Sequence, residues 1–168
     1  MKRNNVLIAI FLYVLSLFLA TGSMEIKSDR LDEYRQYQSL IAGTNEAGFD
    51  DRLVNSSLLA TWLPAQIQRA TGMNEEWLFK VFPTLFISLA APFVFLTSRR
   101  LFNSYSSILA AGLILTSFYL VYYPSMGRVG IGHGILAVFI WALLGKKYIA
   151  AALLSILLVL SHYGTTFL

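Results

Sequence analysis

A run of acidic and amide side chains just after the first apolar segment has the residue types and spacing that could do chemistry. The run spans residues 28–37 and reads SDRLDEYRQY. At helical spacing, Asp29, Asp32, Glu33 and Gln36 share one face. Clustered carboxylates beside a bilayer can act as a general base or bind a cation, including a divalent metal. The same pattern also suits a helix start, because serine or aspartate can cap a helix and acids in its first turn favour the helix dipole.

The overall composition places these residues in a membrane protein. The chain has 168 residues, of which 57% are hydrophobic and 13% are charged, and its mean hydropathy is +0.62. Soluble domains carry about 25% charged residues, so we expect an all-α, multi-spanning transmembrane fold. The net charge of +4 does not indicate nucleic-acid binding, because the basic residues sit mostly at segment ends. The chain has no cysteine, which excludes disulfides and thiolate chemistry.

Five apolar segments predict membrane spans, at residues 6–20, 77–97, 108–123, 129–144 and 148–160. The first segment also has features of a signal peptide, but because further apolar segments follow it we predict an uncleaved span. Pro83 and Pro92 in the second span are tolerable inside a packed bundle. Gly130, Gly132 and Gly134 open the fourth span and predict close approach of a neighbouring helix.

The charges give the spans an orientation. Basic pairs fall at every second boundary, as Lys2 with Arg3, Arg99 with Arg100, and Lys146 with Lys147. The acids fall in residues 23–76, on the opposite side. This is the positive-inside pattern, and it predicts a cytoplasmic N-terminus and an extracytoplasmic loop at residues 23–76 in a cell-membrane protein.

Two helices are expected in this loop, at residues 28–41 and 56–70. The second is interrupted by Pro64 and ends near Gly72. Its apolar positions recur at helical spacing at Leu58, Leu59, Trp62, Leu63 and Ile67. An amphipathic helix of this kind, with a tryptophan, is predicted to lie in the membrane interface.

The predicted topology gathers further polar residues at the depth of the acids: Arg128, His133, His162 and Tyr163. Ionisable groups at membrane depth are costly and point to function. Each also has a structural interpretation. Arg128 can snorkel to headgroups, His133 can hydrogen-bond a neighbouring helix, and His162 with Tyr163 can anchor the interface. No pair has diagnostic metal-ligand spacing.

This layout resembles the N-terminal half of GT-C type membrane glycosyltransferases, which include protein O-mannosyltransferases, aminoarabinose transferases of lipid A and oligosaccharyltransferases. They share an inside N-terminus, one span, a long first outer loop with an early acidic motif, interfacial helices and further spans. The run Asp32-Glu33-Tyr34 looks like the acidic pair that opens the loop in the mannosyltransferase branch. This likeness is one of architecture, so what it implies about function is an analogy.

The chain is also similar, across nearly its whole length, to an archaeal family of multi-spanning membrane proteins of uncharacterised activity. The similar stretches are NSSLLATWLP at 55–64, FKVFPTL at 79–85, Arg128 near a span start and SHYGT at 161–165. Val129 departs from the pattern, because a glutamine is expected after the arginine, and this bears on any ligand role for Arg128. Members of that family are longer, so we expect residues 1–168 to be a single transmembrane domain from the N-terminal part of a longer protein, and not a complete enzyme.

The resemblance implies a GT-C-like transferase, or its N-terminal part, that uses a polyprenyl-phosphate-linked sugar on the outer face. Asp29, Asp32 and Glu33 would then activate the acceptor hydroxyl. Asp29 and Glu33 are the candidate ligands of a divalent metal, Mg²⁺ or Mn²⁺. The departing phosphate would be bound by Arg128, His133, His162 and Tyr163. The alternatives are a non-catalytic membrane subunit or lipid-linked-glycan binder, and a transporter, although a transporter should carry polar residues through the inner halves of its spans as well.

The topology can be tested with single cysteines, since the chain has none of its own. We expect an impermeant thiol reagent on intact cells to label a cysteine at Asn45, in the outer loop, and not one at Asn103, beside a basic pair. The reverse result would contradict the predicted orientation.

Overall fold

The structure is a computed structural model that describes residues 3–22, 58–116 and 127–162. Within these ranges the chain is helical and contains no strand, which confirms the all-α class. The elements are α1 (Arg3–Gly22), the π-helical turn η2 (Leu58–Trp62), α4 (Leu63–Thr71), α5 (Glu75–Ile87), α6 (Ala90–Leu101), α7 (Ser104–Thr116), α9 (Gly127–Leu144) and α10 (Tyr148–His162).

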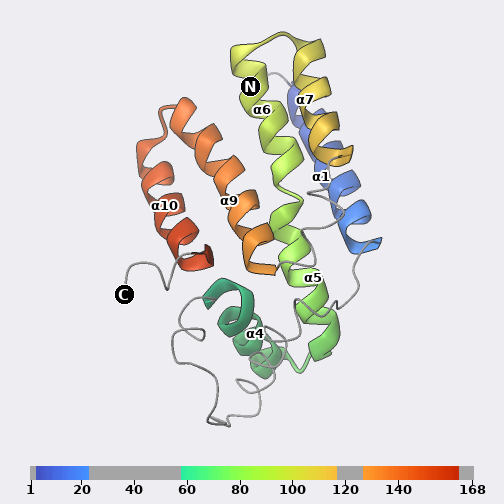
Figure 1. Cartoon of the computed structure of the whole chain (residues 1–168), viewed down its shortest axis with the longest axis vertical. Coiled ribbons are helices and arrows are strands. Elements are labelled where there is room, and N and C mark those ends of the chain that lie inside the picture. The colour runs from blue at the N-terminus through green and yellow to red at the C-terminus, as the bar shows by residue number, and fades with distance from the viewer. Residues whose placement is uncertain (1–2, 23–57, 117–126, 163–168) are drawn as a thin grey trace.

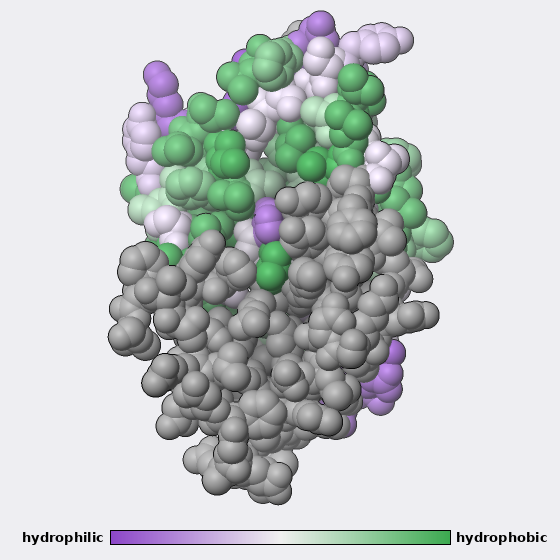
Figure 2. Space-filling view, in the orientation of Figure 1, coloured by the Kyte–Doolittle hydropathy of each residue, from purple (hydrophilic) through white to green (hydrophobic). Residues whose placement is uncertain are grey.

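Two helical stretches among the described residues are long and apolar enough to cross a membrane: α1, and the joined α5 and α6 over residues 75–101. Helices α7, α9 and α10 are apolar but shorter in the parts that are described. Residues 117–123 of the predicted third span lie outside the described residues. Large apolar side chains remain exposed on several helices, among them Phe11 at 64%, Leu109 at 66% and Ile149 at 82%, and Figure 2 shows mostly apolar side chains over the described helices in this view.

Helices α5 and α6 form the centre of the arrangement (Figure 1). Helix α6 contacts α1, α7 and α9, while α10 packs against the far side of α9. One apolar cluster holds α1, α6 and α7 together, and its buried members are Ala9, Leu12, Phe95, Leu96 and Ala111. The start of α1, the α6–α7 connection and the α9–α10 turn lie at one end, and α4 lies at the other (Figure 1).

The central helix is interrupted at Ser88 and Leu89, between α5 and α6. Pro92 lacks the N–H that would bond to the Ser88 carbonyl, so the regular ladder cannot run through this point. Leu89 N donates to Phe86 O at 3.0 Å, and a hydrogen bond to the third residue back is typical of the tighter 3₁₀ turn. The other proline, Pro83, is buried inside α5 and leaves that helix unbroken.

Helix α9 approaches α5 most closely beside this interruption. A Cβ atom added to Gly134 would lie 1.9 Å from the carbonyl oxygen of Phe86 and 3.2 Å from the backbone nitrogen of Ile87. The two backbones are therefore in contact at a point where only glycine fits. The close approach predicted from the glycine-rich start of α9 is confirmed at this residue.

We expect Gly134→Ala to lower the free energy of unfolding by about 1–3 kcal/mol, the range for an overpacked core, because rigid backbone faces the new methyl group. Gly112→Ala in α7 is the matched control, since nothing lies within 4 Å of its added Cβ and alanine favours helix by up to about 1 kcal/mol. Thermal unfolding in detergent micelles measures both, and equal midpoints for the two variants would contradict the close contact.

Candidate functional site

The candidate site lies at the end of the bundle where α9 begins and α10 ends. Helices α9 and α10 pack against each other and are joined by a short turn after Leu144. Arg128 precedes Gly145 by as many residues as His162 follows it. The backbones of Arg128 and His162 therefore lie at the same level of this antiparallel pair, at the end that also carries α4 (Figure 1). The common depth predicted for these two residues agrees with their backbone positions; the structure does not describe their side chains.

His133 lies in the second turn of α9 and is half-buried. Its Nδ1 is 2.8 Å from the carbonyl oxygen of Val129, one turn earlier in the same helix. A carbonyl only accepts, so the ring hydrogen is on Nδ1, and Nε2 of the neutral ring is an acceptor. This hydrogen bond holds the imidazole ring of His133 against its own helix.

The π-helical turn η2 and helix α4 cover this end of the bundle. Their apolar face packs on α5, α9 and α10 in one cluster. Its buried members are Ala60, Leu78, Phe82, Ile131 and Ile135, with Leu59, Leu63, Ile67, Phe86, Leu154 and Leu158 packed against them. The predicted helix with apolar positions at helical spacing is confirmed, and it packs on neighbouring helices. Of the predicted face, Leu59, Leu63 and Ile67 are in the cluster, while Trp62 is 45% exposed. The predicted position in the membrane interface stays a prediction.

Local chemistry explains the shape of this covering segment. Pro64 is the second residue of α4, after η2 and Leu63, and it cannot donate to a preceding carbonyl, so the wider π-helical turn gives way to the α-helical one beside it. Gly72 ends the helix with φ of 65°, a left-handed conformation, and its N–H donates to Gln68 O at 2.8 Å. The predicted helix end at this glycine is confirmed.

The predicted acids Asp29, Asp32 and Glu33, and also Tyr163, lie outside the described residues. The structure does show that the end of α1, the start of α9 and the end of α10 lie towards the same end as α4 (Figure 1). Among the described residues, no three His, Asp or Glu side chains come together as a metal site. The metal assignment to Asp29 and Glu33 stays a prediction.

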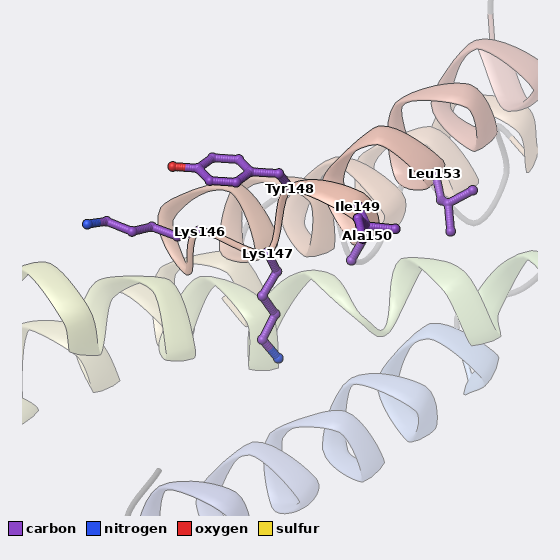
Figure 3. A pocket seen from close by; sticks show the side chains of 6 residues that line it. All are labelled: Lys146, Lys147, Tyr148, Ile149, Ala150 and Leu153. Carbon is purple, nitrogen blue, oxygen red and sulfur yellow. The ribbon is translucent and has the colours of Figure 1, made fainter.

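The sequence did not point to a polar cavity at the opposite end of the bundle. This cavity of about 270 Å³ is lined by Asn5, Leu96, Arg99, Arg100 and Trp141. In the sequence, Arg99 and Arg100 indicate only the orientation of the spans. The feature that could have predicted the cavity is Trp141, which lies near a second basic pair, Lys146 with Lys147. A separate, shallow hollow runs along the start of α10, where Lys146 and Tyr148 point away from the bundle and Lys147 points the other way (Figure 3).

No known protein family, curated protein or solved structure matches this chain.

The covering of the site by α4 can be tested at Ile131, which is fully buried in the shared cluster. We expect Ile131→Ala to cost about 2–5 kcal/mol of stability and to loosen α4, so that trypsin cuts faster after the exposed Arg69. Leu136→Ala on the same helix, where the side chain is 37% exposed, should change the cleavage rate much less. Equal rates for the two variants would show that α4 does not depend on this contact.

Proposed function

We propose that the chain is a multi-pass protein of the cell membrane with a cytoplasmic N-terminus and residues 23–76 on the outer face. Two helical stretches of sufficient length support this proposal. The shorter helices α7 and α10 also have exposed apolar side chains, among them Ile108, Leu113, Leu153 and Ile156. Soluble proteins rarely expose such apolar faces to water, whereas lipid would cover them. These faces therefore support membrane positions for α7 and α10 too. The five predicted spans therefore remain our proposal for the membrane arrangement.

Within this arrangement, the proposed function is that of a GT-C-like glycosyltransferase, or its N-terminal part. It would transfer a sugar from a polyprenyl-phosphate-linked donor on the outer face. The supporting observation is the convergence at one end of the bundle: the start of α9, the end of α10 and the end of α1 lie towards the end covered by η2 and α4 (Figure 1). In the sequence, the acidic stretch follows α1, which ends at Gly22.

The proposed reaction is a displacement at the anomeric carbon of the donor sugar. A carboxylate of Asp29, Asp32 or Glu33 takes the proton of the acceptor hydroxyl. The acceptor oxygen then forms the new glycosidic bond while the bond to the polyprenyl phosphate breaks, and the phosphate leaves with the electron pair. Arg128, His133 and His162, with Tyr163, would bind that phosphate and stabilise its charge.

Carboxylates are the ligands that hard divalent cations prefer, so Asp29 and Glu33 suit Mg²⁺ or Mn²⁺. A bound ion of this kind would supply positive charge for the leaving phosphate. The acids themselves would hold the ion in place and position the acceptor.

The two alternative functions differ in what the described helices should contain. A transport path needs polar or charged groups along the spans. The buried polar side chains of the described residues are hydroxyls only, at Ser16, Thr84, Ser88, Ser107 and Ser161, which is unfavourable for a path for ions or sugars. A non-catalytic subunit that binds lipid-linked glycans would use the same end of the bundle, but would transfer no sugar.

The proposal predicts that Glu33→Gln or Asp29→Asn lowers the rate of sugar transfer by at least about 100-fold, the lower range for a lost general base. The measurement is transfer from a labelled polyprenyl-phosphate sugar by membranes that contain the full-length protein. Glu76→Gln is the matched control, because Glu76 is exposed and pairs with Lys80 one turn along α5, and exposed pairs are worth little.

Equal activity of Glu33→Gln and Glu76→Gln would contradict the catalytic role of the acidic stretch. Binding of the labelled donor without any transfer by the unaltered protein would favour the lipid-linked-glycan binder.

A further inference from the structure

The cavity at the basic end of the bundle is made by residues from three helices. Asn5 comes from α1, Leu96, Arg99 and Arg100 come from α6, and Trp141 comes from α9. Lys147, just beyond α9, places its ammonium 4.3 Å from the centre of the Trp141 ring. Two guanidinium groups and one ammonium group therefore lie around one tryptophan.

Among the described residues, no carboxylate lies near these cations. The sequence has no Asp or Glu before Glu25 or after Glu76. The described acids, Glu75 and Glu76, begin α5, while Arg99 and Arg100 end α6, so at helical rise they are roughly 35 Å apart. A negatively charged partner for these cations must come from outside the described part of the chain.

Arg100 is held in a fixed position, although part of its side chain is exposed. Its Nη1 donates to the carbonyl oxygen of Trp141 at 2.6 Å, and its guanidinium carbon lies 4.9 Å from the centre of the Trp141 ring. A Cβ on Gly145 would lie 2.4 Å from Nη1, so this glycine makes room for the guanidinium. In the same turn, the residue with the left-handed backbone conformation is Lys146, with φ of 56°. The glycine therefore serves the contact with Arg100 and not the bend of the turn.

Arg99 carries a hydrogen-bond donor that has no acceptor among the described residues. Its Nε is buried and has no hydrogen-bond partner among the groups of the structure. A buried donor without an acceptor is unfavourable, and more so when it is charged. Arg99 also lines the cavity, so an acceptor bound there could satisfy this side chain. A guanidinium group presents its donors in a planar fork that matches the oxygens of a phosphate group.

We propose that this cavity binds a phosphate group, with Arg99 donating to its oxygens and Arg100 and Lys147 providing the surrounding positive charge. The position of the cavity, at the end of helices whose apolar faces are exposed, suits the headgroup of an anionic phospholipid. A soluble phosphate would satisfy the same donors. The cavity lies at the opposite end of the bundle from η2 and α4, and none of its lining residues belongs to the proposed catalytic groups, so the proposal does not depend on them.

The test measures thermal unfolding of the full chain in neutral detergent micelles. The additions are phosphatidic acid, phosphatidylcholine or inorganic phosphate at increasing concentrations. We expect phosphatidic acid to raise the unfolding midpoint, because a ligand that binds only the folded state stabilises it. Arg99→Gln should weaken the apparent affinity for phosphatidic acid about tenfold, which is the effect of losing one charge-assisted hydrogen bond.

Two further variants separate a built site from general attraction between charges. Lys146→Gln removes one charge at the same end, but this side chain points away from the bundle (Figure 3), so the affinity should stay within about twofold, as for an exposed charge. Gly145→Ala keeps every charge and displaces the Arg100 guanidinium, so it should weaken binding. Unfolding of each variant without added lipid shows that it is folded.

A response to phosphatidic acid alone identifies a lipid headgroup as the ligand. An equal response to inorganic phosphate, also reduced in Arg99→Gln, identifies a soluble phosphate. No response to either, or equal losses in Arg99→Gln and Lys146→Gln, would overturn the proposal.

Discussion

The contact between the backbones of α9 and α5 at Gly134 is the constraint on which the rest of the bundle depends. Two helices approach most closely where one of them carries a glycine, because glycine has no side chain to separate the backbones. The contact falls beside the interruption of the central helix, where Phe86 O meets the glycine. Because α9 is fixed there, its first turns bring Ile131 under η2 and α4, and its later turns bring Trp141 to Phe93 and Arg100.

The same helix therefore joins two chemically different ends. At one end an apolar cluster supports the start of α9, where His133 has its hydrogen fixed on Nδ1 by the Val129 carbonyl. At the other end, basic side chains gather around Trp141 without a carboxylate in the neighbouring sequence. Between the ends, the described helices bury only hydroxyl groups among their polar side chains.

Much of the helical framework was predictable because it follows from local properties. The apolar segments mark α1, the joined α5 and α6, α9 and α10 to within a few residues, and Gly72 ends α4 as its position in the sequence indicates. The interruption at Ser88 was not predicted, since a proline inside an apolar segment can either be absorbed, as Pro83 is, or break the ladder, as happens before Pro92. Of the predicted site, the sequence supplied the residue types, and the structure adds the level of α9 and α10 and the geometry of His133.

The sequence by itself determined the class of the protein, the helical segments and the separation of acids from basic pairs, because composition, segment length and charge are properties of neighbouring residues. Only the tertiary structure decided which faces meet. Helices that are apolar on nearly every side, such as α1 and α9, have no polar stripe to specify their inward face, so packing alone selects it. For the same reason, the exposure of Trp62 and the placement of Arg100 over Trp141 depend on residues distant in the chain, which no local pattern records.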